Sequence, residues 1–224
     1  MKLAIKSIIH SLEFFINLSE DELENLVAIS SLKNYNNSSL LHYEKSQSDK
    51  LLFLVKGLAK AYKIDKHENE IFLYYIYKNH MISEISSLKN DHLTFYSNIT
   101  FVENSQVLSI EYKAFKKHFL DKSLLCLELA NEVIRQSKLL QDLVRREFIF
   151  NSVAKVAMML HSDVVMFNQL KRSDVSLMLH IQPSTLSRVL NRLKNNGIID
   201  IVSGKVIILR PKELKQLYEG LEDE

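Results

Sequence analysis

The stretch from Lys171 to Gly197 restricts the possible folds of this chain most strongly, because residues that start and end helices define two short helices in it. Apolar residues recur at helical spacing over roughly 173–179 and again after Pro183. Proline suits the first position of a helix, since its missing N–H would have no partner there. Gln182 is then the expected N-cap, and Asn195-Asn196-Gly197 the expected C-terminal end of the second helix. The pattern predicts two helices joined by a tight turn.

The second predicted helix has two chemically different faces. Its apolar face would bury Leu186, Val189, Leu190 and Leu193. Its other face carries side chains that can hydrogen-bond base edges and phosphates, namely Ser184, Thr185, Ser187, Arg188, Asn191 and Arg192. A helix that enters the DNA major groove needs this division of its surface.

A predicted β-hairpin follows the two helices. It consists of 198–202, a two-residue turn at Ser203-Gly204, and 205–209. Helix, turn, helix and hairpin in this order make a winged helix, which predicts DNA binding. The alternative for the two helices alone is an ordinary helical hairpin with a solvated basic face.

The charge distribution supports a DNA-binding C-terminal part. Residues 145–215 contain 12 Lys and Arg against 5 Asp and Glu, whereas residues 1–144 contain 17 against 18. Six of the seven arginines lie at or beyond Arg145, although the net charge of the whole chain is only +2. A sensor joined to a basic DNA-binding domain would show this asymmetry.

The N-terminal half predicts a short helix and loop over 1–18, then a helix opened by a capping box of Ser19 and Glu22. Short β-rich segments follow between 31 and 111. They are 51–55, 58–62, 71–77, 95–102 and 107–110, with Gly57 at a tight turn. Many short, evenly spaced strands favour a small β-roll or jelly-roll barrel.

A long helix is expected after a short one at 112–119, with Asp121 as its cap. One apolar stripe on it consists of Cys126, Leu129, Ala130, Val133, Ser137, Leu140 and Val144, and beside it lie Leu125, Leu139 and Leu143. A helix with two apolar surfaces can pack on the β-roll with one and on a second subunit with the other. The alternative is a helix buried within one subunit.

The sequence SDVSLMLHIQPSTLSRVLNRLKNNGII resembles the DNA-binding motif of the Crp/Fnr family of bacterial transcription regulators. The family's Glu-x-x-Ser-Arg corresponds to Ser184, Ser187 and Arg188, and the usual turn glycine is His180. The segment FLVKGLAKAY is similar to a hairpin of cyclic-nucleotide-binding folds.

The resemblance implies an α+β chain with a β-roll sensor over 1–120, a dimerisation helix and hinge over 121–146, and a winged helix-turn-helix over 147–224. The hinge is expected at 145–147, the first helix of the last domain at 148–161, a short strand at 166–170, and the final helix at 212–221. The implied partners are a second copy of the chain and an inverted-repeat DNA operator. RNA polymerase and a small effector are further candidates.

The recognition helix is expected at Pro183–Asn195. Base contacts are assigned to Ser184, Ser187 and Arg188, with Arg188 reading guanine. Phosphate contacts are assigned to Lys171, Arg172, Thr185, Arg192 and Lys205.

The sequence argues against cyclic AMP as the effector. Family members that bind it use a Gly-Glu pair and an Arg-Ser pair, and here these positions are Ser83-Glu84 and Tyr96-Ser97. No arginine occurs in residues 1–134, and a buried phosphate needs a bidentate cation. Tyr74, Glu84, Tyr96 and Ser97, with Tyr75 and Tyr77 beside them, are candidates for another effector pocket; the alternative is that they form the core and its rim.

The single cysteine, Cys126, rules out an internal disulfide and an iron–sulfur cluster held by several thiolates, and its expected role is apolar packing. Haem remains open as an alternative cofactor because one histidine can suffice, and the sensor contains His10, His42, His67, His80 and His92. No residue is assigned as a metal ligand. The sequence contains no enzyme motif, signal peptide or membrane-spanning apolar run that we recognise, so a cytoplasmic regulator is expected.

Overall fold

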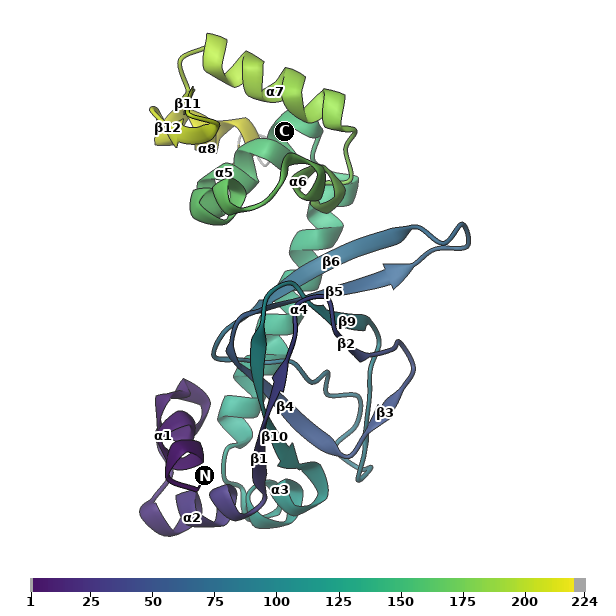
Figure 1. Ribbon diagram of the computed structural model, residues 1–224, viewed down its shortest axis with the longest axis vertical. Helices are drawn as coiled ribbons and strands as arrows, with labels where there is room; N and C mark the ends of the chain where they lie inside the picture. Colours follow the sequence, from purple (N-terminus) through teal and green to yellow (C-terminus); the bar gives the residue numbers. More distant parts are fainter. Residues whose placement is uncertain (1, 220–224) are drawn as a thin grey trace. The chain divides into compact units, whose positions relative to one another are not determined.

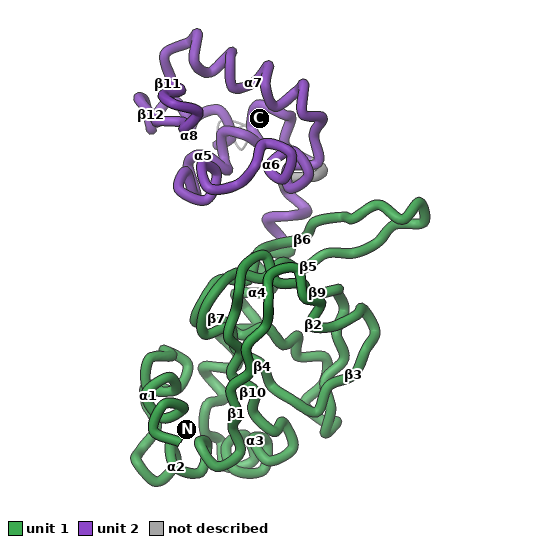
Figure 2. Tube along the Cα trace, viewed as in Figure 1, with its two compact units in different colours: residues 1–140 green, residues 141–224 purple. Residues whose placement is uncertain are grey.

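The computed structural model describes residues 2–219, with the side chains of 146–148 outside the description. The chain divides into two compact units, residues 1–140 and 141–224, which are coloured separately in Figure 2. Each unit is described by itself. Strands dominate the first unit and helices the second, which confirms the expected α+β class.

Unit 1 has helices both before and after its strands. The N-terminal ones are α1 (Lys2–Ser11), the 3₁₀ helix η1 (Glu13–Phe15) and α2 (Glu20–Ala28). The predicted capping box of α2 is present, because Glu22 accepts hydrogen bonds from the backbone N–H and the hydroxyl of Ser19 at 2.8 and 2.7 Å. The later ones are α3 (Tyr112–His118) and η2 (Leu120–Lys122).

Two four-stranded antiparallel sheets form the centre of unit 1 (Figure 1). The first has the order β1-β10-β4-β7 and contains Ser30–Tyr35, Ser105–Glu111, Lys50–Lys56 and His80–Met81. The second has the order β2-β9-β5-β6 and contains Leu40–His42, Asn98–Phe101, Leu58–Ile64 and Glu70–Tyr77. A small pair, β3 (Gln47–Ser48) and β8 (Leu93–Thr94), completes the unit. The expected two-sheet roll is confirmed, but its sheets stay open instead of closing into a barrel.

Four strands were not predicted individually, namely β1, β2, β3 and β7, and among the predicted ones the largest difference is at 95–102. The expected strand over 95–102 is replaced by β8 (Leu93–Thr94) and β9 (Asn98–Phe101), because the chain bends at 96–97. Gly57 lies in the predicted turn between β4 and β5 with a φ of +92°. A Cβ there would lie 2.1 Å from Oγ of Ser105, so only glycine fits this turn.

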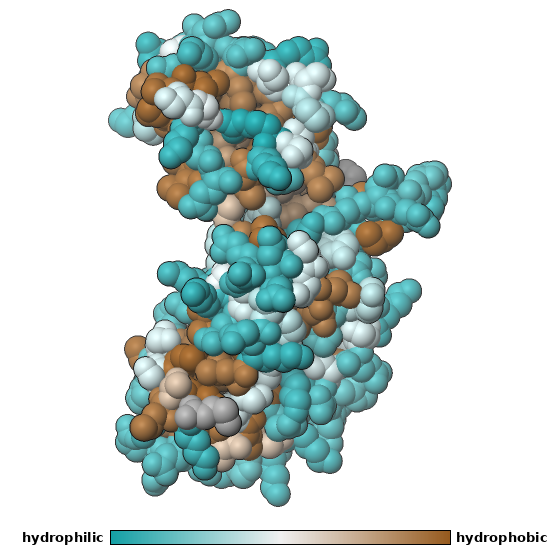
Figure 3. Space-filling model, in the orientation of Figure 1, coloured by the Kyte–Doolittle hydropathy of each residue, from teal (hydrophilic) through white to brown (hydrophobic). Residues whose placement is uncertain are grey.

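Two apolar clusters fill unit 1. One includes Leu52, Ala59, Ile76, Phe95 and Phe101 from both sheets. The other joins the first sheet to the helices and includes Ile9, Phe15, Leu26, Phe53 and Phe115. On the face drawn in Figure 3, apolar side chains gather over the α1 end of unit 1, where Leu3 and Ile16 are exposed.

Helix α4 (Cys126–Phe148) begins later than predicted. Asp121 lies in η2 and does not cap α4, because Ser123 and Leu125 have left-handed φ values of +61° and +58° that interrupt the helix. The boundary between the two units falls within α4, after Leu140. The expected hinge at 145–147 is helical, and the side chains of 146 and 147 lie outside the described residues.

Unit 2 contains the end of α4 and the elements α5 (Ser152–Gln169), α6 (Arg172–Met178), α7 (Pro183–Asn195), β11 (Ile199–Val202), β12 (Lys205–Ile208) and α8 (Pro211–Glu219). The first helix therefore does not start at Phe148. Asn151 caps α5 by accepting from the N–H groups of Val153 and Ala154 at 3.0 Å each.

The predicted strand at 166–170 is wrong. Asp163 has non-helical backbone angles, and its carboxylate accepts from the N–H of Met166 at 2.8 Å, so the chain re-enters a helix there. The predicted end of α8 at Leu221 lies outside the described residues. Among the described residues, none of the helices is both long enough and apolar enough to cross a membrane.

Candidate functional site

The second helix of the predicted pair is α7, with the bounds that the sequence predicted. Its apolar side chains Leu186, Val189, Leu190 and Leu193 are all buried. They pack α7 on α5, α6 and β11. Because one face is fixed in the core, the opposite face of α7 is presented to solvent.

Both helices of the pair end in the same hydrogen-bonding motif. After α7, the N–H groups of Gly197 and Ile198 donate to the carbonyl oxygens of Lys194 and Leu193 at 2.8 and 3.0 Å. After α6, His180 and Ile181 donate to Leu177 and Ser176 at 3.1 Å each.

These paired bonds form a Schellman motif, whose turning residue adopts left-handed φ. That φ is +67° at Gly197 and +49° at His180. His180 thus takes, at a steric cost, the conformation of the glycine that the family pattern places there.

Two side chains fix the β11–β12 hairpin to the helices. Asn168 of α5 forms two hydrogen bonds with the backbone of Val206, at 2.9 and 2.8 Å. Arg172 of α6 donates from Nη2 to the carbonyl oxygen of Gly204 at 2.9 Å. Sequence reasoning missed Asn168, because an asparagine near a helix end gives no signal of a partner 38 residues away.

The residues assigned to base contacts lie on one exposed part of α7. Ser184, Ser187 and Arg188 are all exposed. Arg188 is folded along the helix, with Nη2 donating to Oγ1 of half-buried Thr185 at 3.1 Å. The guanidinium is therefore held at the solvent face by a weak local contact that a rotamer change can release.

The residues assigned to phosphate contacts have different environments. Lys171, Arg192 and Lys205 are exposed, and none forms an ion pair within the described part of the chain. Arg172 is different, because its guanidinium lies 4.5 Å from the ring centre of Phe167 and bonds to Gly204. Burial lowers the pKa of Arg172. Its geometry is that of a structural tie, which argues against a direct phosphate contact.

The four predicted effector residues come together around one carboxylate. Oε1 of Glu84 accepts from the hydroxyls of Tyr74 and Ser97 at 3.2 and 2.9 Å, and Oε2 accepts from the backbone N–H of Tyr96. Burial, with the nearby Glu84 charge, raises the pKa of Tyr74 above its usual range. The ring of Tyr96 is 54% exposed and so does not enclose this group.

Ser83, at the position of the family's phosphate-binding glycine, is buried. Its hydroxyl accepts from the N–H of Leu52 at 2.9 Å, and its carbonyl accepts from Gln136 of α4 at 3.0 Å. These polar groups already bind one another, which matches the reading of these residues as core and rim.

The candidate dimer residues divide between two surfaces of α4. Leu129 is buried in the core of unit 1, so it belongs with Leu125 and half-buried Leu139 on the inner face and not on the stripe. The remaining stripe residues are exposed, namely Cys126, Ala130, Val133, Ser137, Leu140 and Val144. Cys126 is thus not a packing residue within its own subunit. An apolar groove of about 510 Å³ runs along part of this stripe, against Ile85, Leu88 and Leu120.

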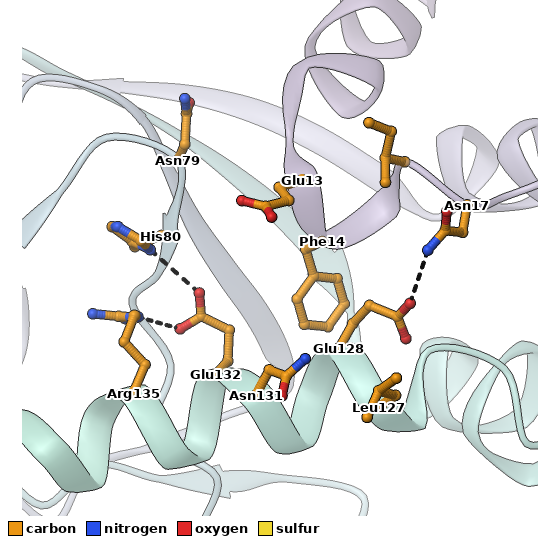
Figure 4. A pocket seen from close by; sticks show the side chains of 11 residues that line it. Glu13, Phe14, Asn17, Asn79, His80, Leu127, Glu128, Asn131, Glu132 and Arg135 are labelled. Atoms are coloured by element: carbon orange, nitrogen blue, oxygen red, sulfur yellow. Dashed lines mark hydrogen bonds and ion pairs between the residues drawn. The ribbon is translucent and has the colours of Figure 1, made fainter.

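A second, polar cavity of about 370 Å³ lies between η1, the β6–β7 turn and α4 (Figure 4). Its charged lining residues include Glu13, Glu128, Glu132, Arg135 and His80. Sequence reasoning missed it, because these residues are far apart in the chain and only His80 had been singled out.

The sensor histidines do not gather. Across the described residues, no three His, Cys, Asp or Glu side chains form a metal-binding group. His42 stacks on Phe95 with ring centres 3.9 Å apart, and burial lowers its pKa. Nδ1 of His80 lies 3.3 Å from Glu132.

Comparison with known proteins agrees with this architecture. Residues 138–217 match the Crp-like helix-turn-helix domain. Comparison of the sequence with curated proteins gives no match.

Solved structures share the fold at low sequence identity. FixK2 from Bradyrhizobium japonicum is 13% identical, with 84% of this chain and 97% of that chain covered and a TM-score of 0.71. A CooA mutant from Carboxydothermus hydrogenoformans is 16% identical, with coverages of 93% and 95% and a TM-score of 0.72. A protein of Eubacterium rectale, described as a regulator of the crp/fnr family, is 14% identical, with coverages of 92% and 97% and a TM-score of 0.64.

Proposed function

From the premise that this chain has the Crp/Fnr fold and carries a Crp-like helix-turn-helix domain, we propose that it is a dimeric, sequence-specific, DNA-binding transcription regulator. Helix α7 of each subunit would enter the major groove of one half of an inverted-repeat operator. A signal other than cAMP, received in unit 1, would control DNA affinity.

The observation that carries the proposal is the two-faced packing of α7. Four apolar side chains fix its orientation, while Ser184, Ser187 and Arg188 stay exposed on the other side. Arg188 can donate two hydrogen bonds to guanine, and Lys171, Arg192 and Lys205 supply unpaired charge for phosphates. With Ser184 at the family's glutamate position, the operator sequence is expected to differ from that of family members with glutamate.

The dimer is supported by the exposed stripe on α4. The exposed positions 126, 130, 133, 137, 140 and 144 alternate in steps of four and three, which is the heptad spacing of a coiled coil. Val133, Leu140 and Val144 are 41%, 45% and 56% exposed, which is costly for apolar side chains in a lone subunit. A parallel pairing of two α4 helices would cover them and place two α7 helices around one two-fold axis.

The rejection of cAMP is supported by the bonding of Glu84 and Ser83. Both side chains are already satisfied by protein partners, and Tyr96 stands where the family's arginine binds phosphate. An anionic phosphate placed beside the Glu84 carboxylate would meet a like charge.

The decisive experiment is selection of bound sequences from random DNA duplexes with the purified full-length protein. We expect an inverted repeat whose half-sites lie one helical turn apart. Recovery of no enriched sequence, together with no binding to any duplex at low salt, would contradict the proposal. It would instead favour a protein-interaction module that uses the same helix pair.

A haem-based version of the regulator is the second candidate, favoured by the contact of His80 with Glu132. A ligating histidine commonly hydrogen-bonds a carboxylate through its second nitrogen. The charged lining of the cavity beside His80 is a poor match for an apolar macrocycle, so we place this candidate second. A Soret absorption band that is lost in His80→Ala would support haem.

A further inference from the structure

The polar cavity beside α4 has three walls that come from distant parts of unit 1. The N-terminal segment contributes Glu13, Phe14, Ile16 and Asn17, the β6–β7 turn contributes Asn79 and His80, and α4 contributes Leu127, Glu128, Asn131, Glu132 and Arg135. Its volume of about 370 Å³ lies within the range of small-molecule sites.

Two basic side chains of this cavity, His80 and Arg135, lie on one side. Figure 4 shows His80 and Arg135 on the side away from Glu128 and Asn17. Arg135 is the only arginine in residues 1–140. It donates from Nε to Glu132 at 2.7 Å, and within the described residues its four other N–H groups have no protein acceptor.

Glu132 contacts both of these side chains. Its side chain is 13% exposed, and it contacts His80 at 3.3 Å and Arg135 at 2.7 Å. Burial opposes ionisation of Glu132, but the hydrogen bond from His80 and the charge of Arg135 outweigh it and lower the pKa. Glu132 is therefore ionised at neutral pH, where it balances Arg135.

The carboxylate of Glu128 lies on the other side, whereas Glu13 of η1 lies on the His80 side of Phe14 in Figure 4. Glu128 accepts from Nδ2 of Asn17 at 3.3 Å, and Glu13 faces the cavity without a protein partner in the described chain. Phe14, which is 8% exposed, lies between the two charged sides in Figure 4. The cavity thus has an end with guanidinium N–H donors, an apolar middle and an end with the Glu128 carboxylate.

We propose that this cavity binds a dipolar small molecule, such as a di- or tripeptide, with its carboxylate toward the N–H groups of Arg135 and its ammonium group toward Glu128. Glu128 and Arg135 are seven residues apart, which is about 10 Å along a helix. An α-amino acid carries both charges on one carbon and cannot span that separation. Two or three extended residues span about 7–10 Å and can.

A ligand in this position would join the N-terminal segment to α4. Positions 127, 128, 131 and 135 lie on α4 beside the exposed stripe at 126, 130 and 133. Binding would therefore favour one placement of α4 against the sheet, which is a route by which a signal could reach the dimer surface. Only this regulatory consequence rests on the proposed function; the binding itself does not.

The test uses the full-length protein and measures binding by calorimetry, with thermal melting as a second readout. Dialanine and trialanine are the probes. L-Alanine is the short control, and N-acetyl-trialanine amide is the control without charged ends. We expect trialanine to bind and raise the melting temperature, whereas L-alanine and the capped peptide do not.

Glu128→Gln and Arg135→Gln should each weaken trialanine binding about tenfold or more, because each removes a charge-assisted contact. Matched controls are Glu24→Gln on α2 and Lys138→Gln on the exposed side of α4, which should change it less than about twofold. Arg135→Gln also removes the ion-pair partner of Glu132. If Arg135→Gln unfolds for that reason, Glu128→Gln still tests the proposal.

Failure of both peptides to bind would overturn the proposal, as would equal binding of the capped peptide or unchanged binding in Glu128→Gln. If the protein binds the peptide but selects no DNA sequence, the proposed binding site is supported and the proposed function is contradicted. Sequence-specific DNA binding without peptide binding would do the reverse.

Discussion

Nη2 of Arg172 donates a hydrogen bond to the carbonyl oxygen of Gly204, 2.9 Å away, and so joins the start of α6 to the turn of the β11–β12 hairpin. The same guanidinium stacks 4.5 Å from the centre of the Phe167 ring. The arginine that the sequence assigns to a phosphate contact thus also ties the hairpin to α6.

The first prediction separates these two roles of the basic residues. Arg172→Ala should lower the free energy of unfolding by about 1–3 kcal/mol, because a hydrogen bond from a charged group and a ring contact are lost. Lys205→Ala should leave stability within about 0.5 kcal/mol but flatten the salt dependence of DNA binding by about 1.8 in log–log slope, about 0.9 for each subunit of the dimer. Urea unfolding and titrations at several salt concentrations measure both. An unchanged stability in Arg172→Ala would return that residue to the phosphate contacts.

The second prediction concerns base reading by α7. Arg188→Ala should cost about 1–3 kcal/mol in binding at one base pair per half-site and relax the preference there. Competition binding with single-base operator variants measures this. Lys194→Ala is the control, since Lys194 lies on the same helix but is paired with Asp200 at 3.0 Å. If Arg188→Ala kept the full base preference, another residue would read that position.

The third prediction tests the exposed stripe on α4 as a dimer surface. Val133→Arg or Leu140→Arg should convert the dimer to monomers, because a charge at a heptad core position must be buried without a partner. Lys138→Glu, off the stripe, is the control. Sedimentation measures the mass of each variant. Oxidative cross-linking through the single Cys126 should yield a covalent dimer if the pairing is parallel and in register; a monomeric wild type would contradict the assignment.

The fourth prediction contrasts two glycines with positive φ. Gly204→Ala should cost about 1–2 kcal/mol from backbone strain alone, since a Cβ at its φ of +78° meets nothing within 4 Å. Gly57→Ala should cost clearly more, because its Cβ would also approach the backbone oxygen of Asn104 to 2.9 Å. Denaturant unfolding of the two variants gives the difference, and equal costs would show that the turn at Gly57 relaxes freely.

The fifth prediction follows from the lowered pKa of Glu132. A carboxyl whose folded pKa lies below its unfolded value stabilises the protein above that unfolded value, near 4.5. The stabilisation is lost as pH falls through the folded pKa. As pH falls below 5, the free energy of unfolding should therefore decrease less in Glu132→Gln than in the wild type, measured by urea unfolding. Parallel pH profiles would exclude a contribution from the contacts with His80 and Arg135.

The sequence by itself determined the local structure around α6 and α7. Pro183 and Gly197 set the bounds of α7 because each restricts backbone geometry within a single turn. The helical spacing of apolar residues likewise identified the buried face of α7 correctly. The capping box at Ser19 and Glu22 followed from the same short-range chemistry.

Errors arose where several local signals competed. Asp121 resembles a helix cap, yet Ser123 and Leu125 adopt left-handed conformations that delay α4 to Cys126. Asp163 interrupts α5 and restarts it, where the sequence suggested a strand. Leu129 fits the spacing of the exposed stripe but packs inward, because an apolar residue between two apolar faces can join either.

Tertiary structure alone decided the contacts between residues far apart in the chain. The sequence assigned Arg172 to a phosphate contact because it is a basic residue at the start of the helix pair. Its hydrogen bond to Gly204 depends on tertiary structure. Glu84 and its three partners were predicted as a group, yet their mutual hydrogen bonds, which close the group on itself, depend on strand register. The cavity of Glu13, His80, Glu128 and Arg135 joins three segments, and no periodicity encodes such a meeting. Neighbouring residues determine the local backbone geometry, whereas contacts between residues far apart in the chain depend on how the whole core packs.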